Sequence, residues 1–556
     1  MGRRLAPGRL GTLLLLLTVA ATAAPPPADA APLVHVSVLH RHGARMAPVF
    51  EGGQLTWAYA MLTAPGAVMA RRLGDALRAR YVGTRVLPVV LPAEHEEIAV
   101  RSRSTGVART VQTAFGVRRR LVRVAAGGPA GDDDGAVANV PMVHHRAAAA
   151  DTLLRFPGSW PSWGLRGRRW LAFTADNARA TAVLGAAGVA TLVAELSPLY
   201  PPCADQLMNC ALLGQDVAQC RRSNGGLSAA LASIYPQLET IQRLSVQTTF
   251  HYDPTNATAP DHAAGAYGHP LLAAWAADAA TAVSRYEAGA PPLDDAFAPL
   301  RHYSAHDTTL SGVLLALGNA TFAGTAAGDA LWVPTFGQAI VAETYADRTM
   351  AFVLLTNSQT AATNFSYTAQ PLLVACATNA DPAVPRAAIA VEQRAACPVG
   401  NFSAALRRFA ATVPRPECFL SPADAALCRG GAGGGGGAAA THAPADVRAA
   451  CAAWRRRCPT EACAAGAFVD AATADAACVP LPAPLRAARF VGAVAAGAVV
   501  CAAVGAAVGA VARSVAGRRR APKRRALDDG GGGDGGGDGA AEAKDDDRRA
   551  IVEHPA

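Results

Sequence analysis

Two patterns are missing from this chain of 556 residues, and each absence excludes a class of protein. No segment expected to fold carries a basic stripe interleaved with aromatic residues, so the net charge of +9 does not indicate nucleic-acid binding. No cysteines stand at zinc-like spacing beside histidines, so the 12 cysteines are better explained by disulfides. These absences favour a protein of an oxidising compartment that binds neither nucleic acid nor structural zinc.

Charge is also missing from two apolar runs near the ends of the chain. Residues 10–20 follow an arginine-rich start and precede small residues, which predicts a signal peptide within residues 1–30; an uncleaved anchor helix is the alternative. Residues 490–512 are uncharged and long enough to form one transmembrane helix. The basic cluster and low-complexity tail over residues 513–556 indicate a disordered cytoplasmic segment. The pattern predicts a type I single-pass membrane protein of the cell surface, an endosome or a lysosome, with the bulk of its chain extracellular or lumenal.

The cysteines and glycosylation sequons fit this topology. Cys501 lies in the predicted span, which leaves 12 − 1 = 11 cysteines outside the cytosol. An odd number requires at least one unpaired or intermolecular thiol. Four Asn-x-Ser/Thr sequons, at Asn256, Asn319, Asn364 and Asn401, precede the span. We therefore expect a disulfide-bonded glycoprotein.

Short apolar stretches alternate with helical patterns and predict an α/β fold. Residues 34–39 and 301–304 have the composition of strands, and residues 66–81 and 308–317 that of helices. We expect a central, mostly parallel sheet flanked by helices, because polar motifs follow the strands as they do in such sheets. Ligands bind at the carboxyl ends of parallel strands, where these motifs lie.

The composition divides the chain before the membrane span into two parts. Residues 31–426 are expected to form the catalytic domain, with an inserted, mainly helical cap at about 143–288 because that stretch lacks clear strands. The cap contains the basic stretch 165–169, which would favour a polyphosphorylated substrate. Residues 427–488 are rich in glycine and cysteine and are interpreted as a juxtamembrane stalk or small disulfide knot.

The motif Arg-His-Gly-x-Arg at residues 41–45 suits attack on a phosphate ester. A phosphate monoester dianion repels nucleophiles, so catalysis depends on positioning and on neutralising its oxygens. Arg41 and Arg45 bracket His42, and the planar guanidinium binds phosphate oxygens in bidentate fashion. A neutral imidazole of His42 could then attack phosphorus, and Gly43 would let the backbone approach the phosphate.

A second motif supplies the proton that the leaving group needs. Asp307 follows His306, which is expected to face the same phosphate, and a carboxylic acid there can protonate the leaving oxygen. A third arginine is expected on a strand between the two motifs. Arg103 is the candidate, with Arg101, on the same face of the strand, as the competing choice.

These motifs together resemble the histidine acid phosphatases, branch two of the histidine phosphatase superfamily. The resemblance lies in residues 41–45, in Arg-Ser-Thr-x-x-x-Arg-Thr at 103–110, and in Tyr-Ser-Ala-His-Asp-Thr-Thr at 303–309. It covers roughly residues 33–420, and the predicted anchor makes the chain similar to lysosomal and protist membrane-bound members. The family implies His42 as nucleophile, Arg41, Arg45, Arg103 and His306 as phosphate ligands, and Asp307 as proton donor. It implies no metal and no cofactor.

The motifs depart from the family pattern at three places. Met46 and Ala47 stand before Pro48, which is one residue later than the usual proline. Gly106 occupies a position where aspartate is common, and residues 57–65 look like an insertion near the site entrance. None of these changes removes an expected catalytic residue.

The leading hypothesis is a membrane-anchored acid phosphatase that hydrolyses phosphate monoesters through a phosphohistidine. One alternative is a narrower inositol-phosphate phosphatase or a phosphotransferase of the same fold. The other is a non-catalytic surface binding protein, because one fold can host many functions.

Overall fold

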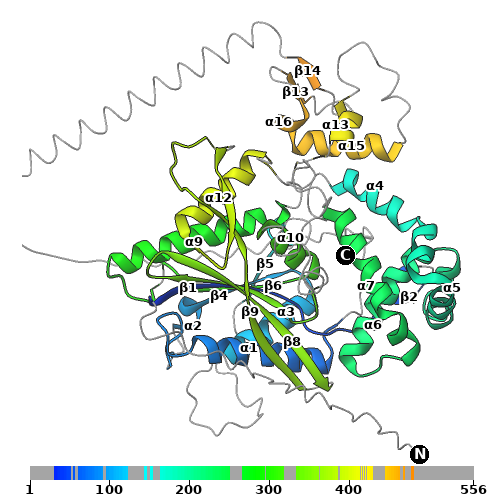
Figure 1. Cartoon of the computed structure of the whole chain (residues 1–556), viewed down its shortest axis with the longest axis horizontal. Coiled ribbons are helices and arrows are strands. Elements are labelled where there is room, and N and C mark those ends of the chain that lie inside the picture. Colours follow the sequence, from blue (N-terminus) through cyan, green and yellow to red (C-terminus); the bar gives the residue numbers. More distant parts are fainter. Residues whose placement is uncertain are drawn as a thin grey trace, which may run out of the picture. The chain divides into compact units, whose positions relative to one another are not determined.

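Figure 1 shows the fold, which is known from a computed structural model of the chain. The structure describes residues 31–51, 54–56, 61–89, 91, 95–122, 143–146, 151–154, 163–250, 266–294, 296–317, 334–361, 364–385, 388–412, 415, 418, 420, 422–429, 445–463, 467–469 and 478–480. The chain divides into two compact units, with the boundary between Asp424 and Ala425, and each unit is described by itself.

A central sheet of eight strands organises the first unit. The strand order is β12-β8-β7-β1-β6-β4-β5, and β9 also pairs with β8. The strands are β1 (Leu33–Arg41), β4 (Val100–Thr105), β5 (Val143–Arg146), β6 (Leu300–Ala305), β7 (Ala339–Tyr345), β8 (Thr349–Ala361), β9 (Asn364–Leu372) and β12 (Ala396–Pro398).

The sheet is mixed, so the expectation of a mostly parallel sheet was wrong. Parallel pairing joins β1 to β6, β6 to β4 and β4 to β5. The other four pairings are antiparallel. A tight turn at Ala346–Arg348 returns the chain from β7 into its neighbour β8 and so makes that pair antiparallel. Arg348 has a φ of 69° in this turn and is the one described non-glycine residue with positive φ. The parallel half of the sheet carries the expected polar motifs.

Helices cover both faces of this sheet. Leu73 of α1 and Val117 of α3 pack with Val38 on one face, whereas Trp275 of α9 and Leu314 of α10 pack with other strand residues on the opposite face. The flanking helices are α1 (Ala64–Tyr81), α3 (Ala108–Leu121), α9 (His269–Glu287), α10 (Asp307–Leu317) and α12 (Val399–Thr412). The α/β class with a central sheet flanked by helices is therefore confirmed.

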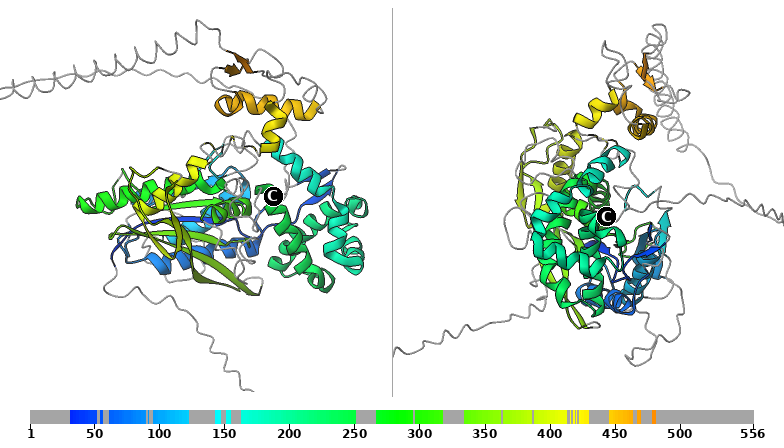
Figure 2. Two further views of the ribbon diagram at one scale, coloured as in Figure 1. Left: turned by 45° about the horizontal axis from the view of Figure 1, so that its top comes forward. Right: turned by 90° about the vertical axis from the view of Figure 1, so that its right-hand side faces the viewer.

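Four helices form a cap beside the sheet (Figure 1, Figure 2). They are α4 (Trp163–Thr174), α5 (Asn177–Leu196), α6 (Leu207–Asn224) and α7 (Ala229–Phe250). Leu192, Leu213 and Leu238 belong to their own apolar cluster. The expected cap at 143–288 also takes in β5, which joins the sheet, and α9, which packs on it.

Smaller elements complete the two units. In the first unit these are β2 (Val49–Glu51), β3 (Gln54–Thr56), α2 (Glu96–Ala99), η3 (Pro201–Ala204), η4 (Ala266–Gly268), β10 (Val374–Ala377) and β11 (Val391–Arg394). Helix α13 (Pro422–Arg429) spans the boundary, and the second unit holds α15 (Ala445–Arg457), α16 (Pro459–Ala462), β13 (Ala467–Val469) and β14 (Cys478–Pro480).

Disulfide bonds cross-link residues within both units, as the cysteine pattern predicts. The bonds link Cys203 to Cys210, Cys376 to Cys397, Cys428 to Cys451, and Cys463 to Cys478. Cys418 and Cys458 are also disulfide-bonded, and Cys220 is a buried free thiol. These bonds indicate an extracellular or lumenal domain, because the cytosol keeps thiols reduced.

One helical stretch among the described residues, Trp170–Leu196, is long and apolar enough to cross a membrane by length and composition. It belongs to the cap, where Gly185 interrupts the helical backbone with a φ of 69° and Leu192 is buried in the cap core. It is therefore weak evidence for a span. The predicted signal peptide, transmembrane helix and tail, at residues 1–30, 490–512 and 513–556, lie outside the described residues.

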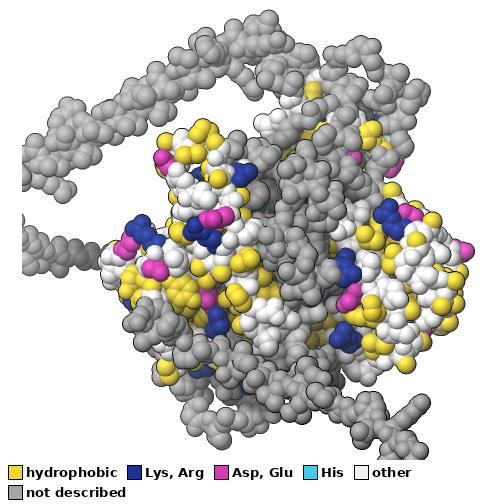
Figure 3. Space-filling model, viewed as in Figure 1, with side chains coloured by type: hydrophobic (Ala, Val, Ile, Leu, Met, Phe, Trp, Pro, Cys, Tyr) yellow, Lys and Arg dark blue, Asp and Glu magenta, His cyan; other side chains and the backbone are white. Residues whose placement is uncertain are grey.

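Figure 3 shows charged side chains of both signs on one face of the molecule. Among the coloured residues in Figure 3, basic and acidic side chains are interspersed and form no continuous basic stripe on the face in view.

Candidate active site

The two polar motifs meet because β1 and β6 are neighbouring parallel strands. Arg41 at the end of β1 is in register with Ala305 at the end of β6. The His42 amide donates to the Ala305 carbonyl at 3.0 Å, which extends the pairing by one residue. His42 and His306 therefore leave the same edge of the sheet, with ring centroids 5.6 Å apart.

Gly43 serves a packing role that differs from the expected one. A Cβ at Gly43 would lie 2.5 Å from the Gly66 carbonyl, and a Cβ at Gly66 would lie 1.9 Å from the Ala44 carbonyl. Both positions need glycine because the backbone of residues 43–44 passes so close to the start of α1 that a Cβ on either glycine would not fit. Thr63 caps that helix by accepting from the Gly66 amide.

His42 is held as a neutral imidazole with a hydrogen-bond partner at each ring nitrogen. Its Nδ1 lies 2.9 Å from the Gly43 carbonyl, which accepts only if Nδ1 carries the proton. Nε2 is then the unprotonated nitrogen, and Arg109 Nε donates to it at 3.2 Å. Burial, followed by the charges of Arg109 and Arg41, lowers the pKa of His42 well below its ordinary value. This arrangement keeps Nε2 nucleophilic.

Several contacts hold the guanidinium of Arg41 close to His42. One end of its guanidinium, Nη2, pairs with Asp307 at 2.6 Å, and the other, Nη1, donates to Gln219 Oε1 at 2.8 Å and to the Pro334 carbonyl at 2.6 Å. The Phe336 ring centroid lies 4.2 Å from the guanidinium carbon. These contacts fix the positive charge of Arg41 next to His42.

Arg45 is held by the cap. Its Nη2 pairs with Asp216 of α6 at 2.6 Å, and its Nη1 approaches the Cys220 sulfur at 3.5 Å. The side chain is almost fully buried. The cap therefore sets the orientation of a residue of the catalytic loop, which the sequence pattern did not indicate.

The structure separates the two arginines of the middle motif. Arg103 on β4 pairs with the buried Asp151 at 2.6 Å, whereas Arg109, in the first turn of α3, is the arginine that contacts His42. Arg101 is exposed. The motif brings this segment close to His42, but the arginine that contacts His42 is Arg109, six residues after the expected Arg103. Its place just after the strand end, where ligands bind, is the signal that could have found it.

His306 and Asp307 are the residues that the second motif contributes to the cluster around His42. His306 Nε2 is 3.0 Å from the Thr105 hydroxyl, which connects it to β4. Asp307 begins α10, and its carboxylate accepts from the Thr308 amide at 2.8 Å as well as from Arg41. The Asp307 side chain is 19% exposed, so it can be reached by a ligand and by solvent.

A buried pair of histidines, His40 and His302, lies next to the cluster around His42. His40 and His302 approach at 2.7 Å between their Nε2 atoms, while His40 Nδ1 donates to the Arg41 carbonyl and His302 Nδ1 contacts Ser102. Burial lowers the pKa of His40 to about 4 and that of His302 well below its ordinary value. Both rings are therefore neutral and connect β1, β6 and β4 beneath the reacting residues.

The departure at Gly106 has a structural reason. A Cβ at this position would lie 2.7 Å from the carbonyl of Arg146, because β5 comes close to the loop after β4. An aspartate here would require the β5 backbone to move. Thr105 is in register with Arg146, so the exposed side chains of His145 and Arg146 end beside the catalytic edge.

The comparisons with known proteins gave matches to solved structures. No protein-family model and no curated protein matches the chain. The Hafnia alvei phytase in complex with tartrate is 17% identical, over 71% of this chain and 100% of that one, with a TM-score of 0.43. The Citrobacter braakii phytase is 13% identical, over 70% and 100%, with a TM-score of 0.44. The Bifidobacterium longum multiple inositol polyphosphate phosphatase is 12% identical, over 63% and 89%, with a TM-score of 0.35.

These similar structures are phytases and related phosphatases of the histidine acid phosphatase family. This is the family that the sequence motifs resemble. Identity and TM-score are low in all three cases, so the activity of this chain is inferred from its own side chains.

Proposed function

We propose that the chain is a phosphate-monoester hydrolase that works through a phosphohistidine on His42. The observation that carries the proposal is the neutral imidazole of His42, whose Nε2 faces Arg109 while Arg41 and His306 surround the ring. A buried nucleophile among arginines suits an anionic electrophile, because the positive charges neutralise the phosphate that the nucleophile must approach.

The reaction has two steps. The Nε2 lone pair attacks phosphorus, the bond from phosphorus to the ester oxygen breaks, and the leaving oxygen takes a proton from Asp307. Water then attacks the phosphohistidine, Asp307 takes a proton from that water, and the bond from nitrogen to phosphorus breaks to release phosphate. Asp307 must carry a proton when the ester binds, which favours an acidic optimum.

The arginines have different roles in this scheme. Arg109 and Arg45 bind the non-bridging oxygens, and Arg41 orients Asp307 and adds charge behind the nucleophile. His306, beside the ring of His42, donates to a further oxygen. We assign the third phosphate-binding position to Arg109 rather than to Arg103, whose guanidinium pairs with Asp151.

The first experiment measures hydrolysis of a generic aryl phosphate at about pH 5 with a chelator present. The secreted chain of residues 31–484 is compared with its His42→Ala variant. Each is incubated with a substrate that carries a labelled phosphate, and the reaction is quenched in base. Wild-type activity and a labelled, acid-labile adduct that the variant lacks are the expected results. A well-folded wild type without activity on any phosphate ester contradicts the proposal and favours a surface binding protein.

Asp307 can be tested by the leaving group. Asp307→Asn should slow release of an alkyl alcohol far more than release of a nitrophenolate, because only the alcohol needs a proton to leave. Equal slowing of both esters would contradict the role as proton donor.

A narrower, polyphosphorylated substrate is a second candidate, favoured by the exposed basic residues at the site edge. His145 and Arg146 end β5 beside Gly106, close to the first turn of α3. Phytases, by their name, act on such a substrate, and the basic stretch 165–169 was the sequence argument for it; the side chains of 166–169 lie outside the described residues. Arg146→Ala should raise the KM for inositol hexakisphosphate while leaving the KM for an aryl phosphate unchanged.

We also infer that the full chain is anchored by the apolar run at 490–512, with the catalytic domain outside the cytosol. The disulfides of both units support the compartment. Full-length protein should resist extraction by alkaline carbonate, and a chain that ends at residue 484 should be secreted. Release of the full-length chain by carbonate would contradict the anchor.

A further inference from the structure

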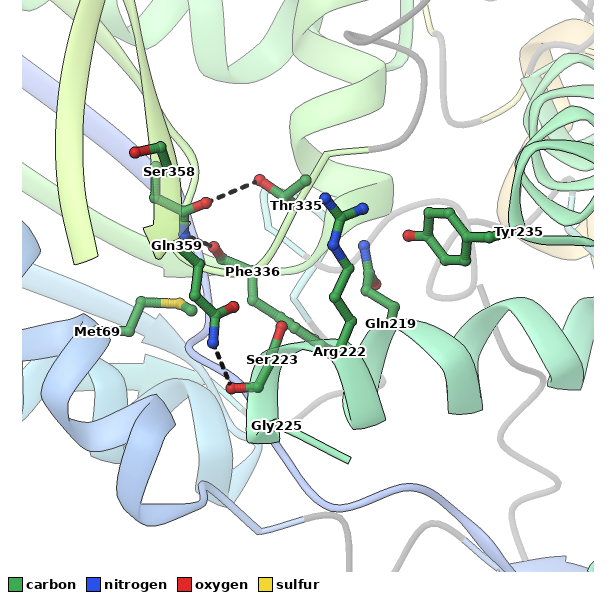
Figure 4. A pocket seen from close by; sticks show the side chains of 11 residues that line it. Met69, Gln219, Arg222, Ser223, Gly225, Tyr235, Thr335, Phe336, Ser358 and Gln359 are labelled. Carbon is green, nitrogen blue, oxygen red and sulfur yellow. Dashed lines mark hydrogen bonds between the residues drawn. The ribbon is translucent and has the colours of Figure 1, made fainter. Parts of the chain in front are cut away.

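A second polar cavity lies next to the catalytic cluster, between the cap and the core (Figure 4). Its volume is about 530 Å³, and eleven residues line it. Seven of them have hydroxyl or amide side chains, Arg222 is the one charged residue among the eleven, and none carries a carboxylate. A lining of neutral donors with a net positive charge suits an anion rather than a cation.

Gln219 directs a buried donor toward this cavity. The residue is 4% exposed, and its Oε1 accepts from Arg41 Nη1, which leaves the amide nitrogen facing the cavity side. Within the described part of the chain, Nε2 of Gln219 has no hydrogen-bond partner. A buried donor without a partner costs free energy, so an acceptor bound in the cavity would stabilise it.

Arg222 and Tyr235 complete the donor set. The guanidinium carbon of Arg222 lies 5.5 Å from the Tyr235 ring centroid. In Figure 4 the hydroxyl of Tyr235 points toward Gln219 and Arg222, whose polar ends lie side by side. Burial, with a smaller contribution from Glu239, raises the pKa of Tyr235 to about 12, so its hydroxyl keeps its proton and can donate.

We propose that this cavity is a second oxyanion site that binds a phosphate group through Arg222, Gln219 and Tyr235. None of these residues takes part in the bond-breaking steps proposed above. Gln219 and Phe336 connect the two sites, because Gln219 accepts from Arg41 and the Phe336 ring both stacks on Arg41 and lines the cavity. An anion on Gln219 Nε2 would hold the amide oxygen toward Arg41, so occupation of the cavity is coupled to the catalytic arginine.

The test is calorimetric titration of inorganic phosphate into the detergent-solubilised full-length protein at low ionic strength. Wild type should show two binding events, one in the cavity and one at His42. Arg222→Ala should lose the cavity event, and Arg109→Ala should lose the event at His42. Loss of the guanidinium should weaken the cavity event by at least about tenfold. Arg222→Lys, which keeps the charge, and Tyr235→Phe, which removes one donor, are the matched controls and should give intermediate affinities.

The two proposals fail in distinguishable ways. If the catalytic assignment fails but the cavity binds phosphate, wild type shows one event that Arg222→Ala removes and Arg109→Ala retains. A single event that Arg109→Ala removes and Arg222→Ala leaves unchanged overturns the cavity site. Folding of each variant is checked by its thermal unfolding.

The phosphate group could come from solution or from the substrate itself, and a kinetic comparison separates these sources. If the cavity receives a second phosphate of one substrate molecule, Arg222→Ala raises the KM for a bisphosphorylated ester and not for an aryl monophosphate. If the occupant is free phosphate, Arg222→Ala leaves both KM values unchanged while the second binding event is lost.

Discussion

Replacing Arg109 and Arg103 separately tests the site most sharply, because the two arginines belong to one motif but have different partners. Arg109→Ala removes a charged donor 3.2 Å from His42 Nε2, where the proposed mechanism places the oxygens of the phosphoryl group. Loss of one such donor typically lowers kcat by roughly 10²–10³-fold. Because Arg109 is the largest charge that depresses the pKa of His42, this pKa should also rise toward its ordinary value. Stability should change little.

Arg103→Ala should give the opposite result. It removes the ion pair of 2.6 Å between Arg103 and the fully buried Asp151 carboxylate. Breaking a buried pair from one side costs about 3 kcal/mol, at the low end of the usual range because the Arg103 side chain is 22% exposed. The expected result is a lower Tm with kcat retained at temperatures where the protein is folded.

The assay measures kcat and KM on an aryl phosphate beside thermal unfolding for both variants. Arg109→Lys and Arg103→Lys are the matched controls, since each keeps the charge without the planar fork. The reasoning is refuted if Arg103→Ala loses as much activity as Arg109→Ala with an unchanged Tm, because Arg103 would then face the phosphate.

Three further predictions concern protonation and glycosylation. Because the pKa of His42 is lowered, kcat/KM should not fall through a midpoint near 6.5 between about pH 7 and pH 5. A midpoint near 6.5 in the wild-type profile that disappears when the surroundings of His42 are altered would contradict a neutral nucleophile. His40 has its pKa lowered to about 4, so the unfolded chain binds more protons below 6.5, and stability should fall by about 2 kcal/mol from pH 7 to pH 5; urea unfolding of wild type and His40→Gln measures this, and equal pH slopes would count against it. Of the two described sequons, exposed Asn364 should carry a glycan and Asn401, whose Nδ2 donates to the Ala377 carbonyl at 2.6 Å, should not; a mass change in Asn401→Gln but not in Asn364→Gln would be the opposite result.

Much of the site follows from local sequence pattern. A strand ending in a polar motif predicts ligand binding at its carboxyl end, and β1 and β6 end at the same edge because they are parallel neighbours. His42, His306 and Asp307 were placed correctly together for this reason. The antiparallel direction of β7 and β8 was missed, so the sheet was expected to be mostly parallel.

The sequence by itself determined the alternation of strands and helices, the disulfide chemistry and the expectation that His42 meets His306 and Asp307, because periodicity, spacing and motif are local. Tertiary structure alone decided which arginine of the middle motif contacts His42, since a strand and the following turn point their side chains to different places. It also decided the cap contacts, in which Asp216 and Gln219 reach Arg45 and Arg41 across 171 and 178 residues. Such contacts depend on packing between distant elements, and no local pattern records them.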